Sequence, residues 1–170
     1  MPVIYNMNRI GLTYLFTIAI TFLGLSQSAE EAYLKKYEEN IQLEYINDVY
    51  IPIDLMDAMK QIDDLSNEEG RARLLEANEE LAAERLVFGL GKWMIVNWNF
   101  YEGSRLSHHI KSYGVTLPDD MARFLIISYH RYLRDAPIEL KERGNKIFDL
   151  RKQEQEERNK QRVVVQEIIK

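Results

Sequence analysis

Two stretches with apolar residues at helical spacing constrain the fold of this chain more than any other feature. The first covers residues 79–99, and the second, residues 121–133, is apolar on most sides. Helices of this kind bury their apolar sides, so we expect the two to pack together in the middle of one domain. The expected apolar face of the first stretch comprises Leu81, Leu86, Val87, Leu90, Trp93, Met94, Ile95, Val96 and Trp98.

Two glycines, Gly89 and Gly91, lie inside the first of these stretches. A glycine in a helix interior costs about 1 kcal/mol relative to alanine. We therefore expect that the helix bends here or that another backbone approaches it closely.

The segment 41–53 is different, because it is rich in β-branched and aromatic residues. An Asn47-Asp48 turn signal divides it, which predicts either a small hairpin or an extended segment, and Pro52 confines it to an edge. The charged residues 30–40 before it predict a short helix or a loose arm.

Residues that favour helix starts divide the chain that follows. Asp54 is placed to cap a helix over 54–65, and Ser66 with Glu69 has the spacing of a capping box for a helix over 67–77.

A second group of these signals lies before residues 121–133. Ser104 is placed to cap a short helix that Gly114 ends. Thr116 and Asp119 have capping spacing at the start of the buried helix, and Pro118 suits its first turn.

The C-terminal part of the chain is strongly polar. Pro137 is expected to open a last helix, and residues 151–162 contain no apolar residue but have favourable i,i+4 charge pairs. Residues 163–170 are apolar again, so we expect this tail to fold back on the body or to dock on a neighbour. The chain is therefore predicted to be mainly α: a single compact helical domain over 29–150 with a small β-hairpin near its N-terminus, and an extended charged C-terminal helix with an apolar tail over 151–170.

The first 28 residues have the pattern of a secretory signal peptide. Arg9 supplies a positive charge, an uncharged apolar run covers residues 10–25, and small residues follow. Cleavage is expected after Ser28, with Ala29 as the next choice. The alternative is an uncleaved anchor, although the run is shorter than the ~20 residues of a spanning helix. We expect a protein of the periplasm or the exterior, with no stable membrane span after cleavage.

Composition excludes several classes of function. The chain has 22 Lys and Arg against 27 Asp and Glu, so no basic excess exists to neutralise a nucleic acid backbone. It has no cysteine, which excludes disulfides, thiolate metal sites and cysteine nucleophiles. Stability must therefore come from packing, and we expect no nucleic acid partner.

Aromatic and amide side chains gather near residue 95. Trp93 and Trp98 could form an aromatic ligand platform, or could simply pack in the core. Asn97 needs hydrogen-bond partners in such apolar surroundings, and Arg105 or His130 could supply them.

Two helix starts carry charges that bear on a site. Gly103-Ser104-Arg105-Leu106 is similar to an anion-binding helix start, or else contains a cap and an arginine that ties two helices together. Asp119 and Asp120 could act as paired acids, or could simply stabilise a helix N-terminus.

The three histidines do not form a metal site. His108 and His109 point about 100° apart on a helix, and no His-x-x-x-His spacing exists, so we expect neither a metal nor another cofactor. Ser128-Tyr129-His130-Arg131 brings four polar side chains onto the buried helix, but Ser128 and His130 diverge too far for a simple catalytic triad.

Several of these motifs together resemble an uncharacterised family of exported bacterial proteins, a domain of unknown function. The resemblance runs from Tyr50 to about Leu150. It rests on Tyr50-Ile51-Pro52, Phe88-Gly89-Leu90-Gly91 with Trp93, Asn97-Trp98, Gly103-Ser104-Arg105-Leu106, Pro118-Asp119-Asp120-Met121 and Ser128-Tyr129-His130-Arg131. The chain departs from the family pattern at Ile95, where a basic residue is usual, and at Leu117, where a histidine is usual.

The resemblance implies no activity, but it singles out one set of side chains. We expect these to form a cluster that binds a ligand: Trp93, Asn97, Trp98, Arg105, Asp119, Asp120, His130 and Arg131.

These observations favour a non-enzymatic extracytoplasmic binding or interaction protein, with a protein partner or a small anionic ligand. The alternative is a hydrolase or lyase that acts on an envelope polymer through His130 with Asp119 or Asp120. A third hypothesis is a structural component of a larger assembly, in which residues 151–170 mediate association.

Overall fold

A computed structural model describes the backbone of residues 29–168 and the side chains of residues 29–162. The signal peptide predicted over residues 1–28 lies outside this part. Residues 29–40 form a helix, so of the two alternatives for residues 30–40, a short helix or a loose arm, the structure has the helix. The chain divides into two compact units after Glu39. This helix lies in the first unit up to Glu39, and all the helices and strands described below lie in the second unit, residues 40–170. In the described residues, no helix is long and apolar enough to cross a membrane.

The predicted hairpin is confirmed, and it is short. β1 (Tyr45–Ile46) and β2 (Val49–Tyr50) pair in antiparallel orientation, with Tyr45 opposite Tyr50. Asn47 and Asp48 both have positive φ, at 50° and 62°. Two consecutive left-handed residues make the type of turn that follows the natural twist of a hairpin, and Asn and Asp tolerate this conformation best after glycine.

Two helices follow the hairpin, α2 (Leu55–Leu65) and α3 (Glu68–Glu76). Asp54 caps α2 as predicted. The capping box predicted to start at Ser66 is wrong, because Asn67 is the N-cap of α3 and its side chain accepts the N–H three residues later. Ser66 instead ends α2. Serine and asparagine are both good N-caps, so the choice between them followed from the end of α2, which uses Ser66 as its C-cap.

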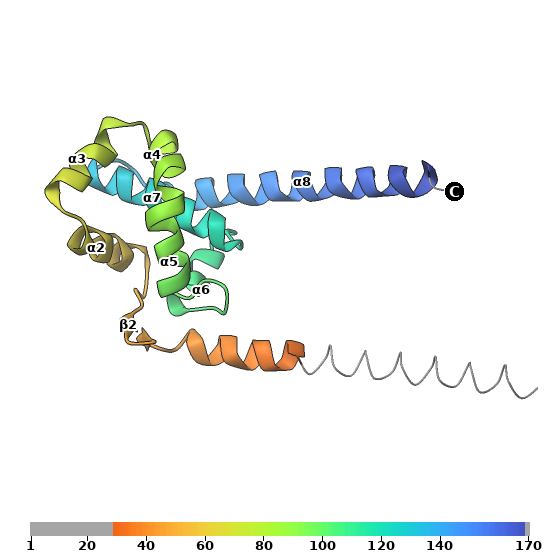
Figure 1. Ribbon diagram of the computed structural model, residues 1–170, viewed down its shortest axis with the longest axis horizontal. Coiled ribbons are helices and arrows are strands. Elements are labelled where there is room, and N and C mark those ends of the chain that lie inside the picture. The colour runs from red at the N-terminus through yellow and green to blue at the C-terminus, as the bar shows by residue number, and fades with distance from the viewer. Residues whose placement is uncertain (1–28, 169–170) are drawn as a thin grey trace, which may run out of the picture. The chain divides into compact units, whose positions relative to one another are not determined.

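The central helix predicted over 79–99 is present in three consecutive parts. These are α4 (Glu79–Leu86), the π-helical turn η1 (Val87–Gly91) and α5 (Lys92–Asn97). Figure 1 labels α4 and α5. The irregularity therefore lies at the two glycines.

The glycines in η1 have different surroundings. A Cβ on Gly91 would lie 3.3 Å from the Val87 Cγ2, 3.4 Å from the Ala122 Cβ and 3.6 Å from the Ile126 Cδ1, so the nearest atoms belong to side chains and not to the other backbone that was predicted. A Cβ on Gly89 would meet nothing within 4 Å. Of the two glycines, Gly91 is the one that is closely packed.

The predicted apolar face of this helix needs correction. Leu81, Trp93 and Val96 are 37%, 36% and 63% exposed, while Ala82 and Ala83 are buried. A π-helical turn inserts an extra residue, which rotates the residues after it relative to those before it. A single 3.6-residue period therefore cannot describe both halves.

A short helix leads to the centre of the domain. α6 (Arg105–Lys111) begins at Ser104 as predicted, with a capping box formed with Ser107. Gly114, at φ +88°, lies beyond its end in the left-handed conformation that glycine favours.

α7 (Pro118–Leu133) is the buried helix on which the rest of the domain is built. Pro118 occupies its first turn as predicted, but Thr116 does not cap it: Leu117 is the N-cap and makes no side-chain capping bond. Ten of its residues are buried, and it contacts α2, α3, α4, η1, α5 and α6. The predicted packing of residues 121–133 against residues 79–99 is confirmed.

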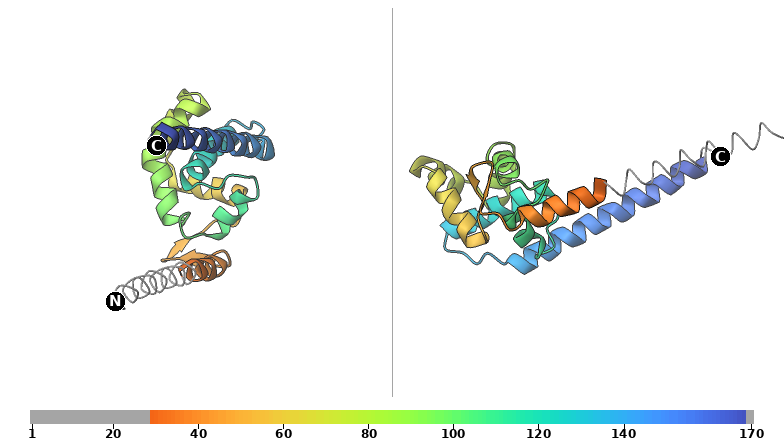
Figure 2. Two further views of the ribbon diagram at one scale, coloured as in Figure 1. Left: turned by 90° about the vertical axis from the view of Figure 1, so that its right-hand side faces the viewer. Right: turned by 90° about the horizontal axis from the view of Figure 1, so that it is seen from below.

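The last helix, α8 (Leu140–Ile168), extends beyond the other elements of residues 40–168 (Figure 2). Its predicted start at Pro137 is wrong, because Glu139 has φ +53°, which no α-helix contains. Residues 151–162 are exposed along its length, as expected for a solvated helix. The backbone of residues 163–168 continues α8, and the predicted role of the apolar tail lies outside the described side chains.

Candidate functional site

The two tryptophans lie at opposite ends of α5, and their rings are in contact. Their ring centroids are 5.6 Å apart in an edge-to-face arrangement, and Trp98 is 1% exposed whereas Trp93 remains partly exposed. The Asn97 amide donates to the Trp93 carbonyl at 2.9 Å, so its predicted pairing with Arg105 or His130 is wrong. The amide is satisfied locally because it lies near the surface, not in the core.

Arg105 connects α6 to the end of the hairpin. Its Nε donates to the Ile51 carbonyl at 2.6 Å, and its guanidinium carbon lies 5.1 Å from the centre of the Tyr50 ring. Of the two interpretations of Gly103-Ser104-Arg105-Leu106, the contacts of Arg105 agree with the second, in which the arginine links two parts of the fold. An anionic ligand at this helix start would have to compete with these contacts.

Asp119 and Asp120 do not converge. Asp120 is 8% exposed and accepts two hydrogen bonds from Arg151 of α8, at 2.6 and 2.7 Å, whereas Asp119 is exposed. These contacts hold α8 against the start of α7.

His130 is a core residue. It is 4% exposed, its Nε2 lies 3.0 Å from the Ala77 carbonyl, and its Nδ1 has no hydrogen-bond partner. It follows Asp120 by ten positions on α7, which places the two about 15 Å apart along the helix axis. General base catalysis by this pair requires contact through at most one water, and the pair does not have it.

Arg131 connects three elements. It donates to both carboxylate oxygens of Glu79 at 2.6 and 2.7 Å, and to Glu139 at 2.6 Å. The hydrogen bonds that Arg131 donates to Glu79 are the main cause that raises the pKa of Arg131. The guanidinium thus fixes the end of α7 to the start of α4.

The predicted cluster as a whole is not brought together. Trp93 contacts both Asn97 and Trp98. The other polar residues of the predicted cluster, except the exposed Asp119, have hydrogen-bond partners on different elements. That these residues bind a ligand stays a prediction. Among the residues that the structure describes, no group of three or more histidines and acids could hold a metal ion.

An exposed apolar surface lies on the outer side of η1 and α5, where core packing was expected. We call Phe88, Trp93 and Val96 the aromatic ridge. Phe88 is 86% exposed, and Trp93 and Val96, 36% and 63% exposed, follow it at five-residue and then three-residue spacing along η1 and α5. The sequence offered one signal for it, the glycines on both sides of Leu90, which mark an irregular turn.

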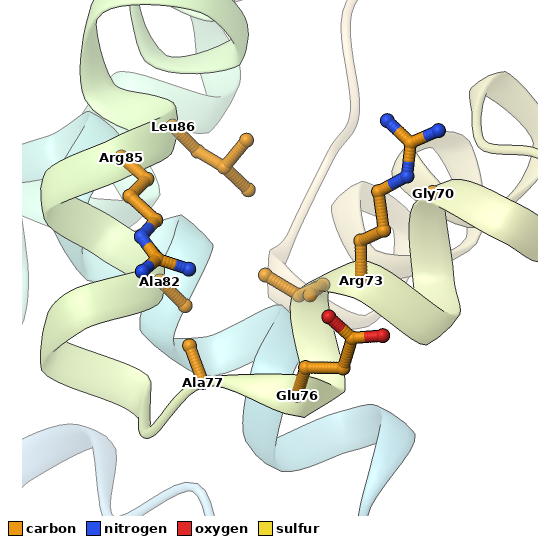
Figure 3. A pocket seen from close by; sticks show the side chains of 8 residues that line it. Gly70, Arg73, Glu76, Ala77, Ala82, Arg85 and Leu86 are labelled. Carbon is orange, nitrogen blue, oxygen red and sulfur yellow. The ribbon is translucent and has the colours of Figure 1, made fainter.

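A groove lies between α3 and α4. Its first part has a volume of about 370 Å³, and Figure 3 shows its side chains. A second part of about 350 Å³ adjoins it, and the two share Gly70, Leu74 and Leu86. We call the two parts the α3–α4 groove. No motif had indicated it, because it is formed by small and aliphatic residues of ordinary type.

Tyr129, at the inner end of this groove, gives a test of the packing around it. Its hydroxyl donates to the Asp63 carboxylate at 2.8 Å, and burial, together with this bond, raises its pKa to about 12. The folded pKa exceeds the unfolded value of about 10, so the contribution to stability is complete below pH 10 and is lost as the pH rises through about 12. We expect an ultraviolet phenolate titration to contain a component near pH 12 that is missing in Tyr129→Phe. Ionisation of every tyrosine near pH 10 would contradict this.

Comparison with known proteins adds a family. Residues 51–133 match a domain of unknown function, DUF6794, which confirms that part of the resemblance found in the sequence. The matched region runs from the end of the hairpin through α7, so it contains the aromatic ridge and the walls of the α3–α4 groove, but not α8. No curated protein and no solved structure matches the chain.

Proposed function

We propose that this chain, whose residues 51–133 match the DUF6794 family, is a non-enzymatic binding protein that works outside the cytoplasm and engages a protein partner through the aromatic ridge.

The exposure of Phe88 on η1 is the observation that carries this proposal. A phenylalanine side chain gains roughly 2 kcal/mol from full burial, and Phe88 is 86% exposed. It lies on a π-helical turn, a rare irregularity that is frequent at functional sites. Aromatic residues are also enriched in the centres of protein interfaces. A partner that covers the ridge would recover the energy of this exposed surface.

A protein partner is favoured over a small anion by the contacts of Arg105. Its Nε donates to the Ile51 carbonyl and its guanidinium lies over the Tyr50 ring, so an anion at this position would have to compete with both contacts. The aromatic ridge, by contrast, requires no rearrangement to be covered.

The site of action is proposed from the sequence of residues 1–28, whose order of positive charge, apolar run and small residues is typical of a cleaved signal peptide. The same preparation that tests binding tests export, because cleavage after Ser28 leaves Ala29 as the first residue of the purified protein.

Substitution of Phe88 tests the proposed function. A tagged chain is purified from the envelope of the native host with its partners, beside Phe88→Ser and a matched control, Phe148→Ser, which removes a phenylalanine that is 52% exposed on α8. We expect wild type and the control to retain the same partner, and Phe88→Ser to bind it about thirtyfold more weakly, the loss typical of an interface hot spot. Equal capture by Phe88→Ser, or a monomeric wild type that captures nothing, would overturn the proposal.

A further inference from the structure

The α3–α4 groove has an apolar floor between two helical walls. Leu74 and Ala77 come from the α3 side, and Ala82 and Leu86 from α4. In Figure 3 the Leu86 side chain points into the space between the walls. Its first part, at about 370 Å³, has the size of a site for a small ligand. The groove is formed by other residues than the aromatic ridge, and this inference does not depend on the proposed function.

The rim of the groove carries one free charge of each sign. Arg73 is paired with Glu69 along α3. Glu76 on α3 and Arg85 on α4 have neither a hydrogen bond nor an ion pair with any residue in the described part of the chain. They also lie too far apart to pair with each other in the structure, and Figure 3 shows them on opposite walls.

This arrangement selects for a particular distribution of charge in a ligand. A ligand with only a carboxylate is attracted by Arg85 and repelled by Glu76. A ligand with only an ammonium is attracted by Glu76 and repelled by Arg85. A ligand with both groups gains from both walls. The part of the ligand that covers Leu74 and Leu86 must be apolar, because these side chains offer no hydrogen-bonding group to satisfy a buried polar one.

From these observations we infer that the α3–α4 groove binds a short apolar peptide with free termini. The peptide's carboxylate pairs with Arg85, its ammonium pairs with Glu76, and its side chains cover the floor. Exposed charge pairs are weak, so each terminus is expected to change affinity by about threefold, and the apolar floor supplies the rest.

The test uses calorimetry with the mature chain and three probes: dileucine, N-acetyl-dileucine, which lacks the ammonium, and dileucine amide, which lacks the carboxylate. We expect dileucine to bind about threefold more tightly than either blocked form. Glu76→Gln should remove the preference over the acetylated form only, and Arg85→Gln the preference over the amide only. Both side chains are exposed, so neither change threatens the fold.

Two controls make the outcome specific to the groove. Lys92→Gln removes an exposed charge on α5, outside the groove, and should leave all three affinities unchanged. Phe88→Ser should also leave them unchanged, which separates this inference from the proposed function. No binding of dileucine by the wild type, equal affinity for the three probes, or preferences that survive both substitutions would overturn the inference.

Discussion

Gly144→Ala is expected to destabilise the domain by about 3 kcal/mol, because the new methyl group has no space. A Cβ at this position would lie 2.0 Å from the Tyr113 carbonyl oxygen and 2.9 Å from its carbon. Both atoms belong to the backbone after α6, and a backbone cannot relieve the clash by changing rotamer as a side chain can. α8 must therefore move away from α6, and the amides of its first half should lose their protection from hydrogen exchange.

Gly89→Ala is the matched control for this change. The same methyl group meets nothing within 4 Å at Gly89, and alanine is the better helix former, so stability should stay equal or rise by up to about 1 kcal/mol. Urea denaturation followed by circular dichroism measures both variants. Coincident midpoints for Gly144→Ala and wild type would show that α8 does not lie against Tyr113.

Arg131→Ala is expected to cost about 2 to 3 kcal/mol, somewhat less than a fully buried pair because solvent partly screens it. The Arg131 side chain is 19% exposed, and its removal leaves Glu79 and Glu139 without a cation. Arg73→Ala is the control: it breaks a pair with Glu69 whose side chains are about 70% exposed, and it should change stability by no more than about 0.5 kcal/mol.

The effect of Arg131→Ala should depend on pH in a defined direction. The hydrogen bond from Arg131 lowers the pKa of Glu79. A carboxylate with a lowered folded pKa contributes stability above its unfolded pKa, about 4.3, and this contribution is lost as the pH falls through the folded value. The stability difference between wild type and Arg131→Ala should therefore shrink in acid. A difference that is constant from neutral pH to pH 3 would contradict the pairing with Glu79.

Local rules predicted most of the helices from the sequence. Asp54, Ser104, Gly114 and Pro118 are each found at the helix end where their chemistry places them. These signals depend only on neighbours within one turn of helix, which the sequence displays directly.

The errors occurred where a competing local conformation decided the outcome. Asn67 replaced Ser66 as the cap of α3, and the left-handed backbone at Glu139 delayed the start of α8. The π-helical turn at Val87–Gly91 changed the phase of the apolar residues that follow it, so Trp93 and Val96 became exposed. Gly89 and Gly91 indicated an irregularity, but not its direction.

The candidate site could not be predicted, because its polar residues have partners far away in the sequence. Arg105 contacts Ile51, and Asp120 contacts Arg151. Each has chemistry that suits a ligand and a structural partner that satisfies the same chemistry. The aromatic ridge and the α3–α4 groove, in contrast, depend on which apolar residues stay uncovered, and only the packed domain reveals that.

The central claim is that a partner covers Phe88, and a photo-reactive phenylalanine analogue at this position tests it most directly. The analogue is placed at position 88 or at the control position 148, and the native host is irradiated while the protein is in place. We expect one discrete cross-linked species from position 88 and none of that mass from position 148. The absence of any adduct from position 88, or the same adducts from both positions, would contradict the claim.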